Sequence, residues 1–162
     1  MFFTLASLLL PPLFVFGVYH LLTWFNVFRI NERSHWKRVA LASAVSHVLL
    51  VTGFLLFLYF DYQAHARMEG GSLAFGPYLF NRSGFWRLAA IFDTIPVLVI
   101  IALFSALDRA GVNPPGVVIV TFAITYLVGT LQWFFVGGGI GALLERFWSG
   151  LKTGNEEDEE WF

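Results

Sequence analysis

The sequence contains no cysteine and few charged residues. Without cysteine, the chain cannot form a disulfide, a thiolate metal centre or an iron–sulfur cluster. Lys, Arg, Asp and Glu make up only 13% of the 162 residues, about half the share in a typical soluble domain. Hydrophobic residues make up 57% and aromatic residues 19%. This composition indicates an integral membrane protein and leaves no room for a separate soluble domain.

Long uncharged stretches predict where the chain crosses the membrane. A helix needs about 20 apolar residues to cross roughly 30 Å of hydrocarbon. Four stretches are long enough, and they predict spans at about 11–28, 38–60, 86–107 and 116–140. We therefore predict an all-α integral membrane protein, a four-helix bundle built from two antiparallel transmembrane hairpins.

Proline and glycine suggest the limits of these spans. Pro11-Pro12 is expected to start the first helix, and Pro114-Pro115 separates the third helix from the fourth. The fourth helical pattern continues past 140, so it must either project from the membrane or break at 137–139, which is Gly-Gly-Gly. The predicted organisation is one transmembrane domain over 1–148 and an acidic C-terminal tail over 149–162.

The charges are unevenly distributed along the chain. Five of the eleven acidic residues are consecutive at 156–160, a pattern typical of a solvated tail and unsuited to binding nucleic acid. The connector 29–38 holds four basic residues and one acidic residue, the densest positive patch in the sequence. Because basic residues favour the inner side of a membrane, we expect both termini outside, in the cytoplasmic (inner) membrane of a bacterium.

Two histidines lie at matching depths in the first hairpin. Counted from the connector at 1.5 Å per residue, His20 and His47 are each roughly 12–14 Å into the membrane. Two facing imidazoles can ligate a b-type haem. The alternative is that each histidine is hydrogen-bonded within the hairpin and holds it together. We favour the structural role, because the chain has no second pair that would complete an electron path.

Asp93 is the one charged residue over 88–107, which is most of the third predicted span. A carboxylate at that depth is costly unless it is protonated or paired. Polar residues recur along one side of the fourth span, and those nearest the level of Asp93 are Thr130 and Gln132. The predicted intramembrane polar cluster is Asp93, Thr121, Thr125, Thr130 and Gln132. We expect Asp93 to be neutral and hydrogen-bonded to Thr130 or Gln132, as a clamp between helices or as a proton or substrate site.

Small residues indicate close helix packing rather than chemistry. Ala40, Ser43 and Ala44 concentrate on one side of the second span, and Gly137 and Gly141 lie one turn apart on the fourth. GGGIGA at 137–142 matches a dinucleotide-binding pattern, but such a pattern must follow a strand, so we reject it. The sequence offers no activated nucleophile, no catalytic residue and no metal site.

Three functions are compatible with the sequence. We favour a non-enzymatic accessory or scaffold subunit of a larger membrane complex, in contact with the lipid bilayer and with other membrane proteins or copies of itself. The first alternative is a redox subunit that holds haem b between His20 and His47 and reacts with a quinol. The second is a small proton-coupled transporter or channel component that uses Asp93, which would require an oligomer because four helices are few.

Overall fold

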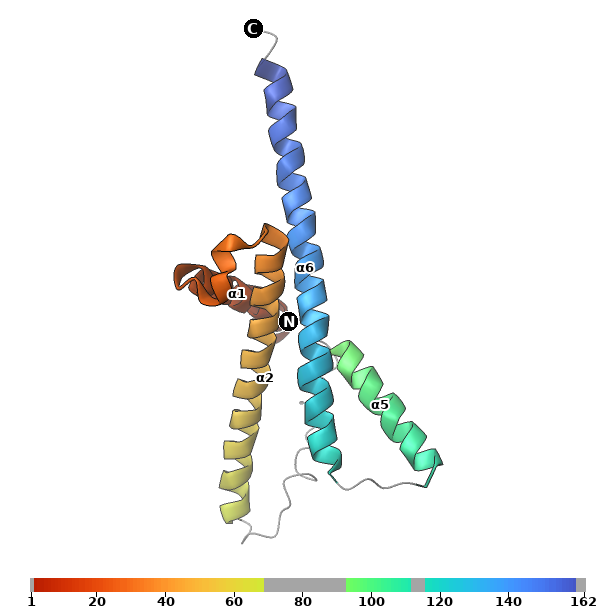
Figure 1. Ribbon diagram of the computed structural model, residues 1–162. Coiled ribbons are helices and arrows are strands. Elements are labelled where there is room, and N and C mark those ends of the chain that lie inside the picture. The colour runs from red at the N-terminus through yellow and green to blue at the C-terminus, as the bar shows by residue number, and fades with distance from the viewer. Residues whose placement is uncertain (1, 69–92, 112–115, 160–162) are drawn as a thin grey trace. The chain divides into compact units, whose positions relative to one another are not determined.

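The computed structural model describes residues 2–68, 93–111 and 116–159, and its regular elements there are all helical (Figure 1). Helix α1 covers Phe2–Trp24, the 3-10 helix η1 covers Val27–Glu32 and α2 covers His35–Met68. Helix α5 covers Thr94–Arg109 and α6 covers Val117–Glu159. The predicted all-α class is therefore confirmed for the described residues.

Within the described ranges, two helices are long and apolar enough to cross a membrane. Within His35–Arg67 of α2 an 18-residue stretch has a mean hydropathy of 2.1, and within Ile119–Ser149 of α6 an 18-residue stretch has a mean hydropathy of 1.7. His35–Arg67 contains the second predicted span, and Ile119–Ser149 contains all of the fourth predicted span except 116–118. The third predicted span differs, because α5 begins only at Thr94 and has 16 residues, while 86–92 lie outside the described residues.

Helix α1 begins before the two prolines rather than at them. Pro11 and Pro12 lie inside α1, which begins at Phe2, so the helix extends to the N-terminal side of the predicted span 11–28. Adjacent prolines remove two backbone donors, but the φ angle of proline is compatible with a helix, and the helix continues. It ends at Trp24, before the predicted residue 28, because Asn26 adopts a left-handed conformation with φ 47°.

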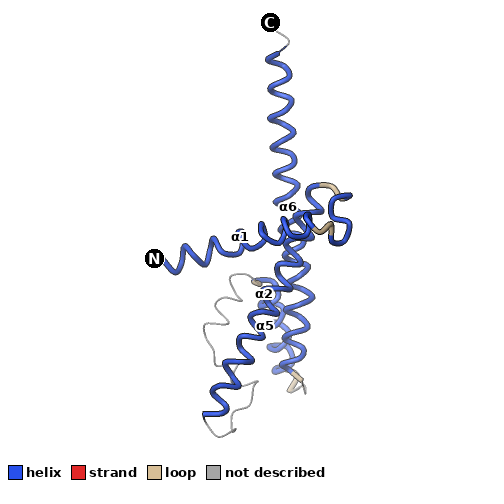
Figure 2. Tube along the Cα trace, turned by 90° about the vertical axis from the view of Figure 1, so that its left-hand side faces the viewer, coloured by secondary structure: helices blue, strands red, loops and turns tan. Residues whose placement is uncertain are grey.

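Helix α6 does not break at its glycines. It continues through 137–139 as one helix of 43 residues to Glu159, which Figure 2 traces without interruption. At 1.5 Å per residue its length is about 65 Å, roughly twice the thickness of the hydrocarbon core. Of the two sequence alternatives, the break at 137–139 does not occur, and the helix continues through 149–159 of the predicted acidic tail.

The chain divides into two compact units, which we describe separately. The first contains residues 1–46 and 133–162, and the second contains residues 47–132. In the first unit, Val18 and Leu22 of α1, Ile30 of η1 and Ala42 of α2 form a buried apolar cluster. The 3-10 helix η1 thus closes the turn from α1 to α2 with an isoleucine that has no exposed surface.

Glycines of α6 lie directly against α2 in the first unit. A Cβ at Gly141 would lie 2.8 Å from the backbone Cα of Trp36, and a Cβ at Gly137 would overlap the side chain of Ser43. Ala40 and Ser43, two of the small residues predicted to form a packing face, are buried. The glycines therefore permit close contact between two helices of this protein, in agreement with the packing predicted from the small residues.

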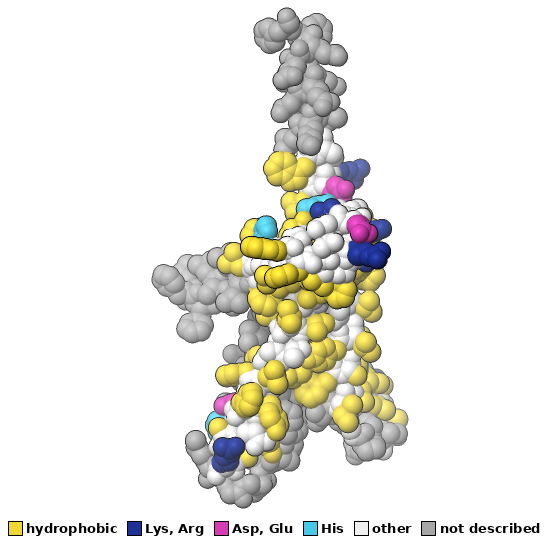
Figure 3. Space-filling view, turned by 60° about the vertical axis from the view of Figure 1, so that its left-hand side comes forward, with side chains coloured by type: hydrophobic (Ala, Val, Ile, Leu, Met, Phe, Trp, Pro, Cys, Tyr) yellow, Lys and Arg dark blue, Asp and Glu magenta, His cyan; other side chains and the backbone are white. Residues whose placement is uncertain are grey.

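Large apolar side chains cover much of the described surface. Figure 3 shows hydrophobic side chains exposed over this face of the helices. Phe57 on α2 is 64% exposed, and Leu127 and Phe135 on α6 are 68% and 70% exposed. A helix with apolar residues on its outward side as well as its packed side suits a surrounding hydrocarbon phase better than water.

Candidate functional site

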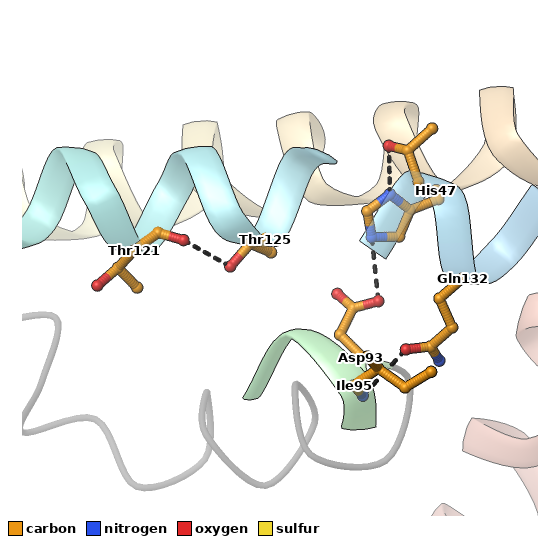
Figure 4. A network of polar contacts seen from close by, with 7 residues as sticks. His47, Asp93, Ile95, Thr121, Thr125 and Gln132 are labelled. Atoms are coloured by element: carbon orange, nitrogen blue, oxygen red, sulfur yellow. Dashed lines mark hydrogen bonds and ion pairs between the residues drawn. The ribbon is translucent and has the colours of Figure 1, made fainter. Parts of the chain in front are cut away.

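A buried histidine and aspartate face each other in the second unit. His47 Nε2 lies 3.0 Å from Asp93 Oδ1, and the two side chains are 2% and 9% exposed (Figure 4). His47 belongs to α2, whereas Asp93 precedes the first residue of α5. The pair therefore joins two helices that are far apart in the sequence, through groups that both bind protons.

The second ring nitrogen of His47 faces α6. His47 Nδ1 lies 3.1 Å from the hydroxyl oxygen of Thr130. A neutral imidazole can accept the hydroxyl hydrogen at Nδ1 and carry its own hydrogen on Nε2, which faces the carboxylate, whereas an imidazolium carries a hydrogen on both nitrogens. The hydroxyl of Thr130 can act as donor or acceptor, so the site accommodates His47 with or without the additional proton.

The backbone at Asp93 explains why its carboxylate is directed away from its own helix. Asp93 occupies the N-cap position of α5 but makes no side-chain capping bond. The side-chain oxygen of Gln132 instead accepts the backbone N–H of Ile95 at 3.0 Å, and Pro96 has no N–H to satisfy. Because α6 supplies this cap, the carboxylate of Asp93 can turn toward His47.

Gly129 provides the space in which the pair meets. A Cβ at this position would lie 2.6 Å from both Cε1 and Nε2 of His47 and 3.3 Å from Oδ1 of Asp93. A separation of 2.6 Å is too short for a Cβ atom in contact with the imidazole, so only glycine fits at this position. The sequence analysis did not predict this role of Gly129.

The predicted cluster on α6 separates into two parts. Thr130 and Gln132 lie at the site, whereas Thr125 donates its hydroxyl hydrogen to the backbone oxygen of Thr121 at 2.9 Å, within α6 itself. Thr121 is buried, and it lies eight residues before Gly129, about two helical turns away (Figure 4). These two threonines therefore extend the polar side of α6 without joining the His47–Asp93 contact.

A second polar contact between α2 and α6 was missing from the sequence interpretation. The hydroxyl oxygens of Thr52 and Tyr126 lie 2.9 Å apart. The hydroxyl of Thr52 also donates to the backbone oxygen of Val48 at 2.7 Å. A tyrosine within an apolar span is a signal for such a partner, because its hydroxyl needs a hydrogen bond when it leaves water.

His20 has a different environment from His47. It is exposed on α1, where its ring makes edge contacts with Phe16 and Tyr19 at centroid distances of 4.3 Å and 5.8 Å. For His47 to ligate a haem iron, one of its ring nitrogens would have to leave Asp93 or Thr130. The partner that the structure gives His47 is thus Asp93, a residue that the sequence interpretation had placed in a separate cluster.

The described ranges 2–68, 93–111 and 116–159 contain no group of three or more His, Cys, Asp or Glu side chains placed to hold a metal ion. Comparison of the chain with protein-family models, with curated proteins and with solved structures finds no match.

Proposed function

We propose that this chain is a multi-pass membrane protein whose His47–Asp93 pair binds and releases a proton, as a component of a proton-coupled transporter or channel. The observation that supports this function is the 3.0 Å contact between two nearly inaccessible titratable groups, one of which lies inside an apolar helix long enough to cross a membrane. Burying ionisable side chains at such a location costs free energy, and a role in proton binding accounts for their presence there.

A purely structural role explains the pair less well. Replacing a buried ion pair with well-packed hydrophobic residues is often neutral or stabilising, so burial of such a pair is weak support for a role in stability. Other interactions also hold α2 against α6, including the hydrogen bond between the hydroxyl groups of Thr52 and Tyr126. We therefore assign the pair a role in proton binding and assign the neighbouring hydroxyls the role of positioning it.

The contacts suggest how a proton would be held. Before the proton arrives, His47 carries its one ring proton on Nε2, facing Oδ1 of Asp93; the delivered proton then resides on Nδ1, and the hydroxyl of Thr130 reorients as Nδ1 changes from acceptor to donor. When the proton leaves, the charge on the pair changes and with it the attraction between α2 and the start of α5. This attraction is the proposed link between protonation and helix position.

The second candidate function is that of a non-enzymatic accessory subunit. The extensive exposed apolar surface favours it, since that surface can contact other membrane proteins as readily as lipid. The two functions are compatible, because four predicted spans, arranged as the bundle that we expect, are few for a complete transporter. A proton-binding subunit within a larger assembly would satisfy both.

Proton flux into liposomes tests the proposal. The purified protein is reconstituted with an internal pH-sensitive dye, and a potassium gradient with valinomycin supplies the membrane potential. We expect wild-type protein to conduct protons above the level of protein-free liposomes, and Asp93→Asn and His47→Gln to lower this flux at least tenfold. Asp61→Asn is the matched control, because Asp61 and His65 form a more exposed pair, 29% and 43% accessible, on the same helix.

Gel filtration must show that each variant assembles like the wild-type protein before its flux is interpreted. Equal flux from wild type and Asp93→Asn would contradict the proposal. A similar loss in Asp61→Asn would also contradict it, because the effect would then not be specific to the buried pair. Wild-type flux at the level of protein-free liposomes would leave the accessory function as the better account.

A further inference from the structure

The turn between α1 and α2 presents aromatic and basic side chains together on the surface. Trp24, Phe25 and Phe28 are 83%, 69% and 59% exposed, and the side chains of Arg29 and Lys37 are also exposed. Figure 3 shows Lys and Arg side chains gathered beside hydrophobic ones on this face of the molecule. We call these five residues the connector surface.

Hydrogen bonds inside the turn keep its shape. Arg38 donates to the backbone oxygens of Arg33 and Asn31 at 2.8 Å and 2.7 Å, and Arg33 donates to the backbone oxygen of Phe28 at 3.3 Å. The side-chain amide of Asn31 donates to the backbone oxygen of Thr23 at 3.0 Å. The guanidinium groups of Arg33 and Arg38 thus stabilise the turn, whereas the connector surface contains the other two basic residues.

The backbone beneath the connector surface is strained. Phe28 and Arg29 both adopt left-handed conformations, with φ 57° and 51°. This conformation is uncommon for residues other than glycine, asparagine and aspartate, and strain of this kind is associated with functional segments. Here it accompanies an outward-facing phenylalanine and an adjacent outward-facing arginine.

We propose that the connector surface binds anionic phospholipid headgroups. Residues 29–38 contain four basic residues against Glu32 alone, so the turn is electrostatically complementary to an anionic membrane face. Exposed tryptophan and phenylalanine beside lysine and arginine suit the interface, where the rings enter the acyl boundary and the cations meet phosphates. This inference rests on the proposed membrane location and is independent of the His47–Asp93 pair.

Native mass spectrometry of the purified protein tests lipid selectivity directly. Phosphatidylglycerol and phosphatidylcholine with identical acyl chains are added in equal amounts, and the bound lipid is counted. We expect wild type to retain phosphatidylglycerol preferentially. The double variant Arg29→Gln with Lys37→Gln should bind it about 25-fold more weakly, at about fivefold for each basic residue lost near an anionic surface.

The matched control is Arg67→Gln with Arg109→Gln, which removes the same charge from exposed positions elsewhere and should keep the wild-type preference. Equal retention of the two lipids by wild type would overturn the proposal, as would an equal loss in both double variants. Displacement of phosphatidylglycerol by soluble glycerol phosphate in similar amount would also overturn it, since the site would then bind phosphate and not a lipid surface.

A second measurement applies if the connector variant does not fold. Ser34→Cys in this cysteine-free chain carries a fluorophore within the turn of an otherwise wild-type protein in bilayers. Phosphatidylglycerol with a spin-labelled headgroup should quench it more strongly than spin-labelled phosphatidylcholine, and equal quenching would contradict the proposal. Both readouts are independent of proton flux, so failure here would leave the proposed proton site untouched.

Discussion

At the scale of single residues, Gly129 determines whether His47 and Asp93 can meet. Gly129 lies so close to the imidazole ring of His47 that a Cβ atom would not fit between them. The ring itself is almost inaccessible to solvent. The imidazole is held at Nδ1 by Thr130 and at Nε2 by Asp93, so it has little freedom to move aside. A glycine in the middle of a long helix is normally a cost, and here that cost is offset by the approach it permits.

We predict opposite effects for two glycine substitutions on α6. Gly129→Ala should lower the free energy of unfolding by about 1–3 kcal/mol, because the new methyl group overpacks the site. Gly139→Ala meets no atom within 4 Å and should be neutral or stabilise the helix by up to about 1 kcal/mol. Thermal unfolding in detergent, followed by tryptophan fluorescence, measures both. A Gly129→Ala protein as stable as Gly139→Ala would show that the close contact does not form.

The sequence singled out His47, Asp93, Thr130 and Gln132 but paired them incorrectly. Counting residues from a turn gives depth, which placed His20 with His47, but it does not give the direction in which a side chain points around its helix. The prediction also placed Asp93 well inside a helix that would begin at 86, whereas α5 begins at Thr94 and leaves Asp93 at its N-cap. The role of Gly129 depends on a three-dimensional approach that a single sequence does not record.

At the scale of helices, α2 and α6 pack through a row of glycines in the first unit. A Cβ at Gly141 would meet the backbone of Trp36, which cannot rotate away as a flexible side chain can. The ammonium group of Lys37 lies over the ring of Trp36, 5.3 Å from its centroid, in a cation–π contact. The contact is therefore fixed by backbone on both sides.

Gly141→Ala is predicted to destabilise this helix contact by about 1–3 kcal/mol, because the methyl group would have to separate two backbones. Gly53→Ala on α2 is the control, since nothing lies within 4 Å of a Cβ there. Unfolding by SDS titration, monitored by circular dichroism, compares them. If the two substitutions have the same effect, α2 and α6 do not approach as closely as the structure indicates.

Helix boundaries followed from the sequence less reliably than helix class. Uncharged apolar runs predicted the class and the positions of the two long helices, because hydrocarbon burial imposes both. The rules for proline and glycine did not fix the start of the first helix, which tolerates the two donors lost at Pro11-Pro12, and did not decide whether the fourth helix breaks at 137–139. Gly137 lies within the helix, and Ser43 of α2 occupies the space that a side chain at position 137 would need.

At the scale of the whole molecule, the basic connector predicts the orientation in the membrane. We expect both termini outside, the connector 29–38 inside and the end of α2 outside. In intact cells, an impermeant thiol reagent should therefore label Arg67→Cys and leave Ser34→Cys unlabelled until the cells are opened. Labelling of position 34 alone in intact cells would reverse the assignment, and equal labelling would argue that α2 does not cross the membrane.

The central claim, that His47 and Asp93 share a proton within the membrane, is tested most directly by solid-state NMR of protein with ¹⁵N-labelled histidine in lipid bilayers. The chain has four histidines, and the His47 resonances are those lost in His47→Gln. We predict that Asp93→Asn shifts both ring-nitrogen resonances of His47, because removing the carboxylate changes where its ring protons reside, and that Asp61→Asn leaves them unchanged. His47 resonances that are identical in wild type and Asp93→Asn would contradict the claim.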